Sequence, residues 1–162
     1  ATGAAGSKKS FNDYQVGELI DHIDGNTICE ADHLFATRLW QNNSKVHFDI
    51  NAREDKKRLI YGGHIISLVR ALSFNGLENA QVIVGINGGT HANPVFAEDT
   101  IYCWSEVLDK IDLNVRNIAA LRLRSVGTKE KNHNMKVKSD DGKYLPTIVL
   151  DFDYWVLVPK EL

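Results

Sequence analysis

The sequence predicts an α+β fold in which one long central helix is wrapped by an antiparallel sheet. The first observation is a helix over residues 62–74 (GGHIISLVRALSF), which is apolar around most of its circumference and should be buried on several sides. The second is the run of strand-like segments after it, over residues 81–86, 101–108, 118–126 and 147–158, the last two with clear alternation. One helix followed by strands in series indicates a sheet that folds back over that helix.

Two further elements precede the central helix. Residues 18–23 (ELIDHI) predict a first strand, and residues 30–41 predict a helix whose N-cap is offered by residues 26–27 (NT). The Asn-Gly pair at 75–76 is a stop signal for the central helix. Residues 140–143 (DDGK) predict a turn before the last strand.

The composition is that of an ordinary globular protein. Of its 162 residues, 43% are hydrophobic and 25% are charged, which corresponds to a single domain. The net charge of -2 argues against nucleic acid as the main partner, because phosphate binding needs a dense basic face. The one basic run, residues 53–58 (REDKKR), is interrupted by two acids. We interpret it as a solvated turn, with contact to a nucleotide phosphate as the minority alternative.

The sequence shows no targeting or membrane segment. No stretch approaches the roughly 20 apolar residues that cross a bilayer, and residues 1–10 lack the apolar centre of a signal peptide. We therefore expect a cytoplasmic protein. Residues 1–10 are interpreted as a linker or cloning remnant and residues 11–162 as the domain. The only methionine is Met135, so the chain has a processed N-terminus or is a piece of something longer.

The two cysteines, Cys29 and Cys103, do not form a disulfide framework in a chain of this length. Neither has metal-ligand spacing around it. We expect both to be buried free thiols.

The stretch between Trp40 and Leu68 carries the pattern that indicates chemistry. A polar turn (NNSKVH) ends in His47, and two glycines, Gly62 and Gly63, open the central helix. Histidine titrates near neutrality and suits proton transfer. The first N–H groups of a helix lack partners within it and favour negative charge. Together these features predict chemistry on a carbonyl compound that develops an oxyanion.

This pattern resembles the MaoC-like, or type 2 enoyl-CoA hydratase, family, whose fold is the hot-dog fold. The family motif runs Asp-x-Asn-Pro-Leu/Ile-His and is followed by a His-Gly pair at the start of the central helix. Here the motif falls on residues 42–47 and the pair on Tyr61 and Gly62. Residues 93–100 (NPVFAEDT) resemble the family's Pro-Val-x-x-x-Asp-Thr segment.

Longer strings resemble one branch of that family, the mesaconyl-CoA hydratases, also called β-methylmalyl-CoA dehydratases. The likeness covers nearly everything from Phe11 to the end. The strings that carry it are ATRLWQN, KVHFD, RLIYGGHIISLVRALSFNGL, INGGTHANPVFAEDTIYCWSEVL and VLDFDYWVLVP. Members of this branch carry two hot-dog units, and the match is to the C-terminal one. The resemblance thus implies a second hot-dog unit as partner, in a homodimer or as a fused or companion half.

The resemblance implies a hydro-lyase that reversibly hydrates an enoyl-CoA, in this branch mesaconyl-CoA to β-methylmalyl-CoA. It implies that His47 exchanges the α-carbon proton, that the Gly62 N–H stabilises the enolate-like oxygen and that Asn42 holds the water. The ordinary alternatives are a surface or core histidine, glycines that only permit close packing, and an asparagine that ends a helix. No metal or redox cofactor is implied, and the CoA is part of the substrate.

Further substrate contacts are suggested around this motif. Arg38 lies four residues before Asn42, on the same helical face, and its guanidinium would suit the free carboxylate of mesaconyl-CoA, with a surface ion pair as the default. Tyr61, Gly63 and His64 surround the helix start and are substrate-binding candidates, with packing or capping as the alternative.

Three departures from the family motif bear on the mechanism. The aspartate is replaced by Asn42, which can position a water but cannot act as a base. The Asn-Pro pair is Ser44-Lys45, and the histidine of His-Gly is Tyr61. Asp49, two residues after His47, is a candidate to orient the imidazole or to replace the lost acid.

The remaining histidine and aromatic features have a structural interpretation. His91 lies near a strand end beside Asn93 and Pro94, and we interpret it as structural. Tyr154 and Trp155 in the last strand are interpreted as core or interface residues.

Two other functions remain open at this point. A hot-dog acyl-CoA thioesterase would direct the water to the carbonyl carbon and release free thiol. A non-catalytic unit would only bind acyl-CoA or complete a partner's site. The missing aspartate favours this last alternative, whereas His47 and Gly62 oppose it.

Overall fold

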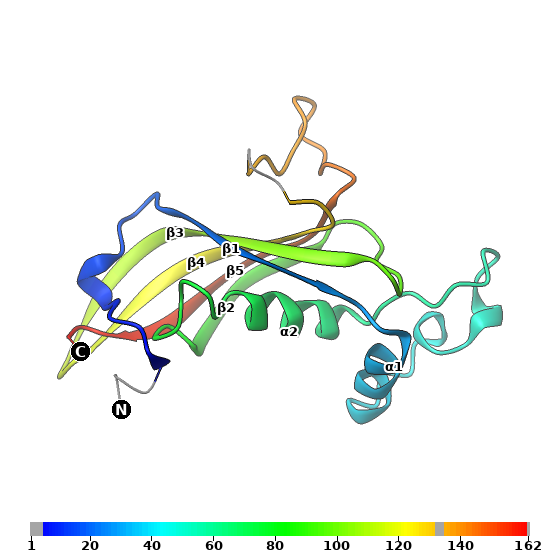
Figure 1. The fold of residues 1–162 in the computed structure, drawn as a ribbon, viewed down its shortest axis with the longest axis horizontal. Helices are drawn as coiled ribbons and strands as arrows, with labels where there is room; N and C mark the ends of the chain where they lie inside the picture. The colour runs from blue at the N-terminus through cyan, green and yellow to red at the C-terminus, as the bar shows by residue number, and fades with distance from the viewer. Residues whose placement is uncertain (1–4, 132–134, 162) are drawn as a thin grey trace.

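The computed structural model describes residues 5–131 and 135–161 of the chain. Its centre is a five-stranded antiparallel sheet in the order β1-β3-β4-β5-β2. The strands are β1 (Leu19–Thr27), β2 (Val82–His91), β3 (Thr100–Val115), β4 (Ile118–Thr128) and β5 (Ile148–Pro159), and the helices are α1 (Glu30–Leu39) and α2 (Gly62–Leu72). The sheet curves around α2 (Figure 1), so the predicted α+β arrangement is confirmed.

The alternation predicted for the last strand is visible in β5. Alternate residues over 152–158 are buried in the core. On the other face, Asp153 accepts two hydrogen bonds from Arg122 of β4, and Asp151 accepts two from Arg124. The solvated face of β5 is therefore tied to its neighbour by charge pairs as well as by the backbone ladder.

Helix α2 is less completely covered than its apolar sequence predicts. Ile65 and Val69 are buried, but Ala71 is exposed. The sheet approaches the helix closely at Gly127 of β4, where an added Cβ would lie 2.8 Å from a methyl carbon of Val69. One side of the helix therefore packs on the sheet, and the strands of this chain leave apolar surface uncovered on the other.

The start of α1 differs from the prediction. Its N-cap is Cys29 rather than Asn26 or Thr27. Both of those residues extend β1, and the Thr27 hydroxyl lies 2.7 Å from the Thr100 hydroxyl of the paired strand β3. The two residues that the local pattern predicted as a helix cap are therefore paired in the sheet instead.

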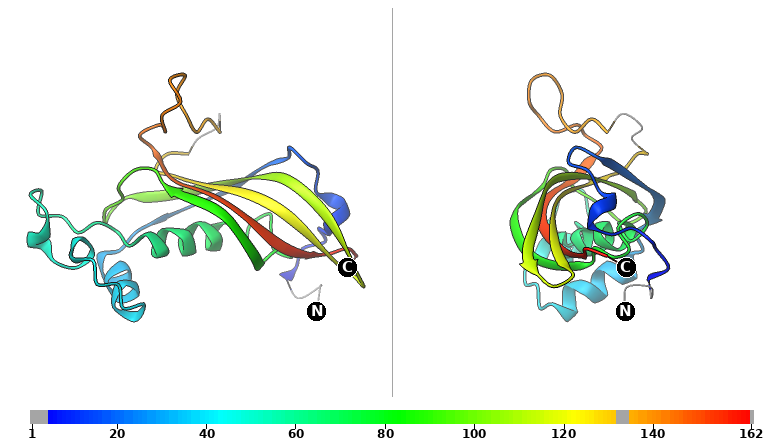
Figure 2. Two further views of the ribbon diagram at one scale, coloured as in Figure 1. Left: turned by 180° about the vertical axis from the view of Figure 1, so that it is seen from behind. Right: turned by 90° about the vertical axis from the view of Figure 1, so that its left-hand side faces the viewer.

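The apolar face of α1 is exposed. Phe35 keeps 68% of its surface exposed and Leu39 keeps 59%, whereas the buried residues of the helix are the polar His33 and Thr37. Helix α1 lies beneath one end of the sheet in the left view of Figure 2, away from the strands, and its apolar face is left exposed.

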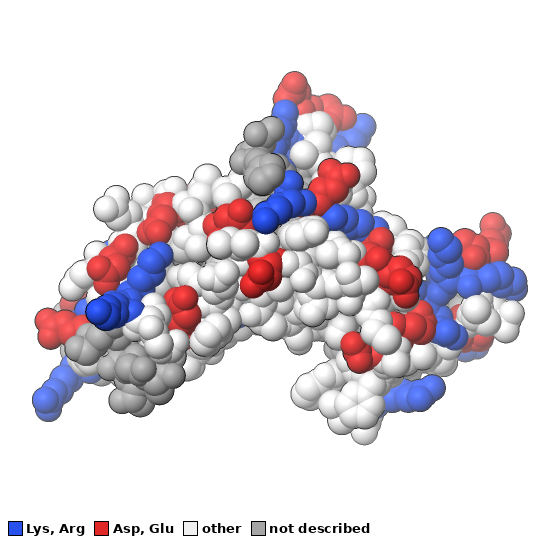
Figure 3. Space-filling view, in the orientation of Figure 1, with Lys and Arg blue, Asp and Glu red and all other residues white. Residues whose placement is uncertain are grey.

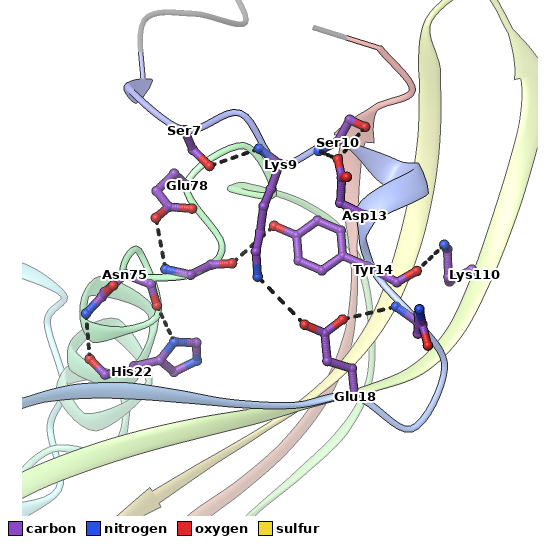
Figure 4. Close-up of polar contacts among 12 residues, drawn as sticks. Ser7, Lys9, Ser10, Asp13, Tyr14, Glu18, His22, Asn75, Glu78 and Lys110 are labelled. Carbon is purple, nitrogen blue, oxygen red and sulfur yellow. Dashed lines mark hydrogen bonds and ion pairs between the residues drawn. The ribbon is translucent and has the colours of Figure 1, made fainter.

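At the end of the domain away from α1, the N-terminal segment is hydrogen-bonded to the loop that follows α2. The Tyr14 hydroxyl donates a hydrogen bond to the Gly76 carbonyl at 3.1 Å, just after α2 (Figure 4). The Asn79 amide donates to the Ser7 carbonyl at 3.2 Å. Residues 1–4 of the predicted linker lie outside the described residues. Ser7, also in the predicted linker, contacts the domain through this hydrogen bond from Asn79.

Two smaller predictions have different outcomes. Cys103 is a buried free thiol as predicted, but Cys29 is exposed, because it sits between β1 and α1 at the outer end of the sheet. The turn predicted at 140–143 is present, with Gly142 in the left-handed region at φ +81°. Within residues 5–131 and 135–161, the helices are too short or too polar to cross a membrane.

Candidate active site

A cavity of about 430 Å³ lies at the N-terminal end of α2. Its polar side chains are those of His47, His91 and Asn93, and Gly62 contributes backbone at the start of the helix. The rest of the lining is apolar. The lining residues are His47, Leu59, Ile60, Gly62, Ile65, His91, Ala92, Asn93, Pro94, Val95 and Val149. They come from four segments of the chain, so the cavity exists only in the folded domain.

Backbone hydrogen bonds fix the walls of this cavity. Leu59 N–H donates to the Val46 carbonyl at 2.9 Å, and Ile60 N–H donates to the Val95 carbonyl at 2.9 Å. The segment that leads into α2 is thereby held between the histidine turn and the segment after β2. A backbone held by such hydrogen bonds limits how far the side chains that line the cavity can move.

His47 ends a short 3₁₀ helix, Lys45–His47, as the polar turn predicted. Its Nδ1 lies 2.8 Å from the Leu59 carbonyl oxygen, which can only accept a hydrogen bond. Nδ1 therefore carries a hydrogen, and Nε2 is the ring nitrogen left for proton exchange. The ring meets Tyr61 edge-on, with centroids 5.9 Å apart.

The N-terminus of α2 offers donors to this cavity. Tyr61 is the N-cap and supplies no side-chain cap. Its own N–H donates to Nδ1 of the buried His33 at 3.4 Å, and its carbonyl accepts from His64. Among the described residues no acceptor is recorded for the N–H groups of Gly62 and Gly63, as expected for the first turn of a helix.

A side chain at either glycine would displace a neighbouring ring. A Cβ at Gly62 would lie 2.6 Å from Nε2 of His91, and a Cβ at Gly63 would lie 2.6 Å from the Tyr61 ring. Close packing and an oxyanion site are therefore compatible at this helix start.

His91 is the residue of the cavity that the sequence did not assign to the site. It is the last residue of β2 and lines the cavity with His47. Partial burial of its ring lowers the pKa of His91, although the residue as a whole is exposed. The signal that could have found it is its place three residues before Pro94, within a string that resembles the family.

Several predicted site residues do not line the cavity. Asn42 Oδ1 accepts from the N–H of Ser44 at 2.9 Å, which closes a local turn. Arg38 lies exposed on α1. Asp49 Oδ1 accepts from the N–H of Asn51 at 2.9 Å and caps the next short helix.

The two other histidines near the helix start have lowered basicity. Burial lowers the pKa of His64, with Asp32 acting in the opposite direction. Burial also lowers the pKa of His33, with Glu30 opposing. Tyr61, Gly63 and His64, which were predicted to bind substrate, are not among the residues that line the cavity, although the Tyr61 ring contacts that of His47. Among residues 5–131 and 135–161, no group of three His, Cys, Asp or Glu side chains is arranged to hold a metal ion.

Two curated relatives match nearly the whole chain. It is 58% identical over 156 residues to mesaconyl-CoA hydratase of Cereibacter sphaeroides. It is 53% identical over 161 residues to β-methylmalyl-CoA dehydratase of Chloroflexus aurantiacus. Each match covers 96% of this chain and 46% of the relative. No family model matches the chain.

Solved structures agree with these relatives. A MaoC domain protein from Chloroflexus aurantiacus J-10-fl is 50% identical, with a TM-score of 0.94, and the match covers 100% of this chain and 48% of that one. The chain belongs to the MaoC-like hot-dog family. At 16% identity, a Mycobacterium tuberculosis protein with a double hot-dog fold shares the fold, with a TM-score of 0.68 over 93% of this chain and 44% of that one.

The MaoC-like chain spans about half the length of the curated relatives it matches. The matches to these relatives and structures confirm the predicted hot-dog fold and the predicted family. The family's His-Gly position falls on Tyr61 and Gly62, at the first turn of α2 and beside His47, as the motif spacing implied.

Proposed function

We propose that this domain serves a CoA-thioester hydro-lyase, which reversibly hydrates mesaconyl-CoA to β-methylmalyl-CoA. The observation that carries the proposal is a cavity that joins His47 to the open helix start at Gly62, in a chain 58% identical to a mesaconyl-CoA hydratase. In the proposed reaction the Gly62 N–H donates to the thioester oxygen as it becomes enolate-like. The Nε2 atom of His47 exchanges the α-carbon proton.

The proposed partners are the acyl-CoA substrate and a second hot-dog unit, either an identical copy or a fused or companion half. The exposed apolar residues of β2, which is an edge strand of the sheet, support such pairing: Val82, Val84 and Ile86. Nucleic acid is not a proposed partner, since acidic and basic side chains are interspersed on the face in Figure 3.

We further propose that the reaction needs no metal or redox cofactor and that the protein is cytoplasmic. Activity retained after dialysis against a chelator is the expected result, and activity restored only by added metal would contradict it.

A second candidate is a non-catalytic unit that completes a partner's site. It is favoured by the motif aspartate being Asn42, whose side-chain carbonyl is engaged in a local turn. Under this alternative, His47→Ala in the complete assembly would leave turnover unchanged.

The test follows the absorbance of the conjugated enoyl thioester when the protein in its complete assembly meets mesaconyl-CoA. Loss of the C=C signal without release of free thiol, abolished by His47→Ala, is the expected result. Stoichiometric thiol release would instead establish a thioesterase. A well-folded assembly that leaves the signal unchanged would contradict the proposed function.

A further inference from the structure

Hydration of a conjugated thioester moves two protons, and this domain presents two imidazoles to its cavity. His47 and His91 are the titratable side chains among the lining residues, which include no carboxylate within the described part of the chain. The motif position that would supply a carboxylate is Asn42, and its amide oxygen accepts from the N–H of Ser44 at 2.9 Å instead. The second proton carrier must therefore come from elsewhere in the fold.

We propose that His91 is the second proton-transfer residue of the cavity and removes a proton from the attacking water, a role that rests on the proposed hydratase function. The resemblance gave Asn42 the role of holding that water, but an amide cannot take up its proton. The geometry points to His91 because its ring stands directly over the helix start that would hold the thioester oxygen.

The His91 ring occupies the space that a side chain at position 62 would need. A Cβ built on Gly62 would come within 2.6 Å of Nε2 and 2.9 Å of Cε1 of His91, closer than nonbonded atoms tolerate. Glycine at this position therefore leaves its N–H available for the thioester oxygen of the proposed reaction, and its missing side chain makes room for the imidazole.

The two imidazoles have different surroundings, which suit different tasks. The Nδ1–H of His47 donates to the Leu59 carbonyl at 2.8 Å, which orients the ring and leaves Nε2 to exchange a proton with the α-carbon. The ring of His91 has no recorded hydrogen-bond partner among the described residues, so both of its nitrogens are free. Desolvation lowers its pKa, which keeps it neutral and able to act as a base.

The proton and electron balance follows from these states. Neutral His91 takes a proton from water as the water oxygen bonds to the β-carbon. The C=C electron pair moves so that negative charge develops on the thioester oxygen, beside the Gly62 N–H. As the carbonyl reforms, protonated His47 delivers its proton to the α-carbon. The reverse reaction begins with His91 protonated and His47 neutral, and exchange with bulk water resets both rings.

The experiment compares wild type with His91→Gln, His91→Phe and Gly62→Ala in the complete assembly, using mesaconyl-CoA. Gln keeps an N–H donor but cannot accept a proton, so we expect kcat to fall on the order of a hundredfold or more in both His91 variants. Gly62→Ala keeps the backbone N–H but displaces the His91 ring, and a comparable fall is expected. Asn87→Ala, on the same strand outside the cavity, is the control and should retain wild-type kcat.

The pH profile separates proton transfer from a structural role. Wild-type hydration should lose rate as the pH falls and His91 becomes protonated, and the residual rate of His91→Gln should lack this acid limb. If His91→Gln kept near-wild-type turnover and His91→Phe lost it, His91 would act only as a hydrogen-bond donor, and the proposal would be overturned. Full turnover by both variants would also overturn it. An inactive wild type would overturn the hydratase function itself. Circular dichroism confirms folding of each variant, and His91→Asn replaces His91→Gln if that variant does not fold.

Discussion

The Nε2 atom of His22 lies 2.8 Å from the Ser105 hydroxyl oxygen, in the interior and at the opposite end of α2 from the cavity. This contact is one link of a chain of hydrogen bonds across the sheet. The Ser105 hydroxyl lies 2.7 Å from that of Ser125, which lies 2.8 Å from that of Tyr154. Arg70 of α2 donates to the Tyr154 hydroxyl at 2.8 Å. Strands β1, β3, β4 and β5 are therefore joined by buried side chains as well as by backbone.

The direction of this chain follows from the state of His22. The Asn75 carbonyl, 2.6 Å from His22 Nδ1, can only accept, so Nδ1 carries a hydrogen. When His22 is neutral, its Nε2 accepts from Ser105, and each hydroxyl of the chain then donates toward His22. A second proton on Nε2 would oppose the Ser105 hydroxyl unless the whole chain reversed.

The first prediction is that the domain loses stability in mild acid. Burial lowers the pKa of His22, and Arg70 lowers it further, while the Asn75 carbonyl, Asp21 and Glu78 act in the opposite direction. The unfolded state then binds the extra proton first, so stability is complete above about pH 6.5 and falls as the pH drops below it. Each pH unit costs up to about 1.4 kcal/mol per such histidine. The other histidines with lowered pKa values add to the slope.

Urea unfolding at pH 7.5 and 5.5 measures this loss. His22→Gln should be less stable at pH 7.5 but should show a smaller difference between the two pH values. An unchanged difference in this variant would show that His22 does not contribute to the acid response.

The second prediction concerns the buried hydroxyl of Tyr154. Tyr154→Phe leaves Ser125 and Arg70 each without one partner in the interior, so the free energy of unfolding should fall by about 1–3 kcal/mol. Tyr144→Phe is the matched control, since its hydroxyl donates to Asp151 at 3.0 Å on a part-exposed surface. Denaturant melts of both variants test this, and equal losses would contradict a special role for the buried chain.

The third prediction tests the close approach of α2 to the sheet. Gly127→Ala places a methyl group 2.8 Å from Val69, and such overpacking costs about 1–3 kcal/mol. Val69→Ala removes the opposing methyl groups and should cost stability by leaving a cavity. The double variant should be more stable than the sum of the two losses predicts, because the new methyl fills part of the space vacated at Val69. A double-mutant cycle of unfolding free energies measures the coupling, and simple additivity would contradict the contact.

The sequence predicted those features that local pattern decides. Alternation defined β5, and the apolar run defined α2, because burial on a sheet or helix repeats with a fixed period. His47 and Gly62, which the motif predicted to act on one substrate, both line the cavity. The catalytic roles of these residues remain predictions.

Features that depend on distant pairing were not predicted from the sequence. His91 reaches Gly62 only because β2 pairs with β5 and ends beside the start of α2. The β1 extension that displaced the N-cap from Asn26 depends in the same way on pairing with β3. Local spacing carries no information about either contact.

The last prediction concerns the exposed apolar face of α1. Because Phe35 is 68% exposed, Phe35→Ser should change the unfolding free energy of the isolated domain by no more than about 0.5 kcal/mol. If a second hot-dog unit covers this face, the same substitution should weaken association of the two units, which sedimentation velocity over a range of concentrations measures. Val16→Ser, at an exposed apolar residue near the opposite end of the domain, is the control and should leave association unchanged. Equal weakening by both substitutions would show that general surface apolarity, rather than the face of α1, drives the association.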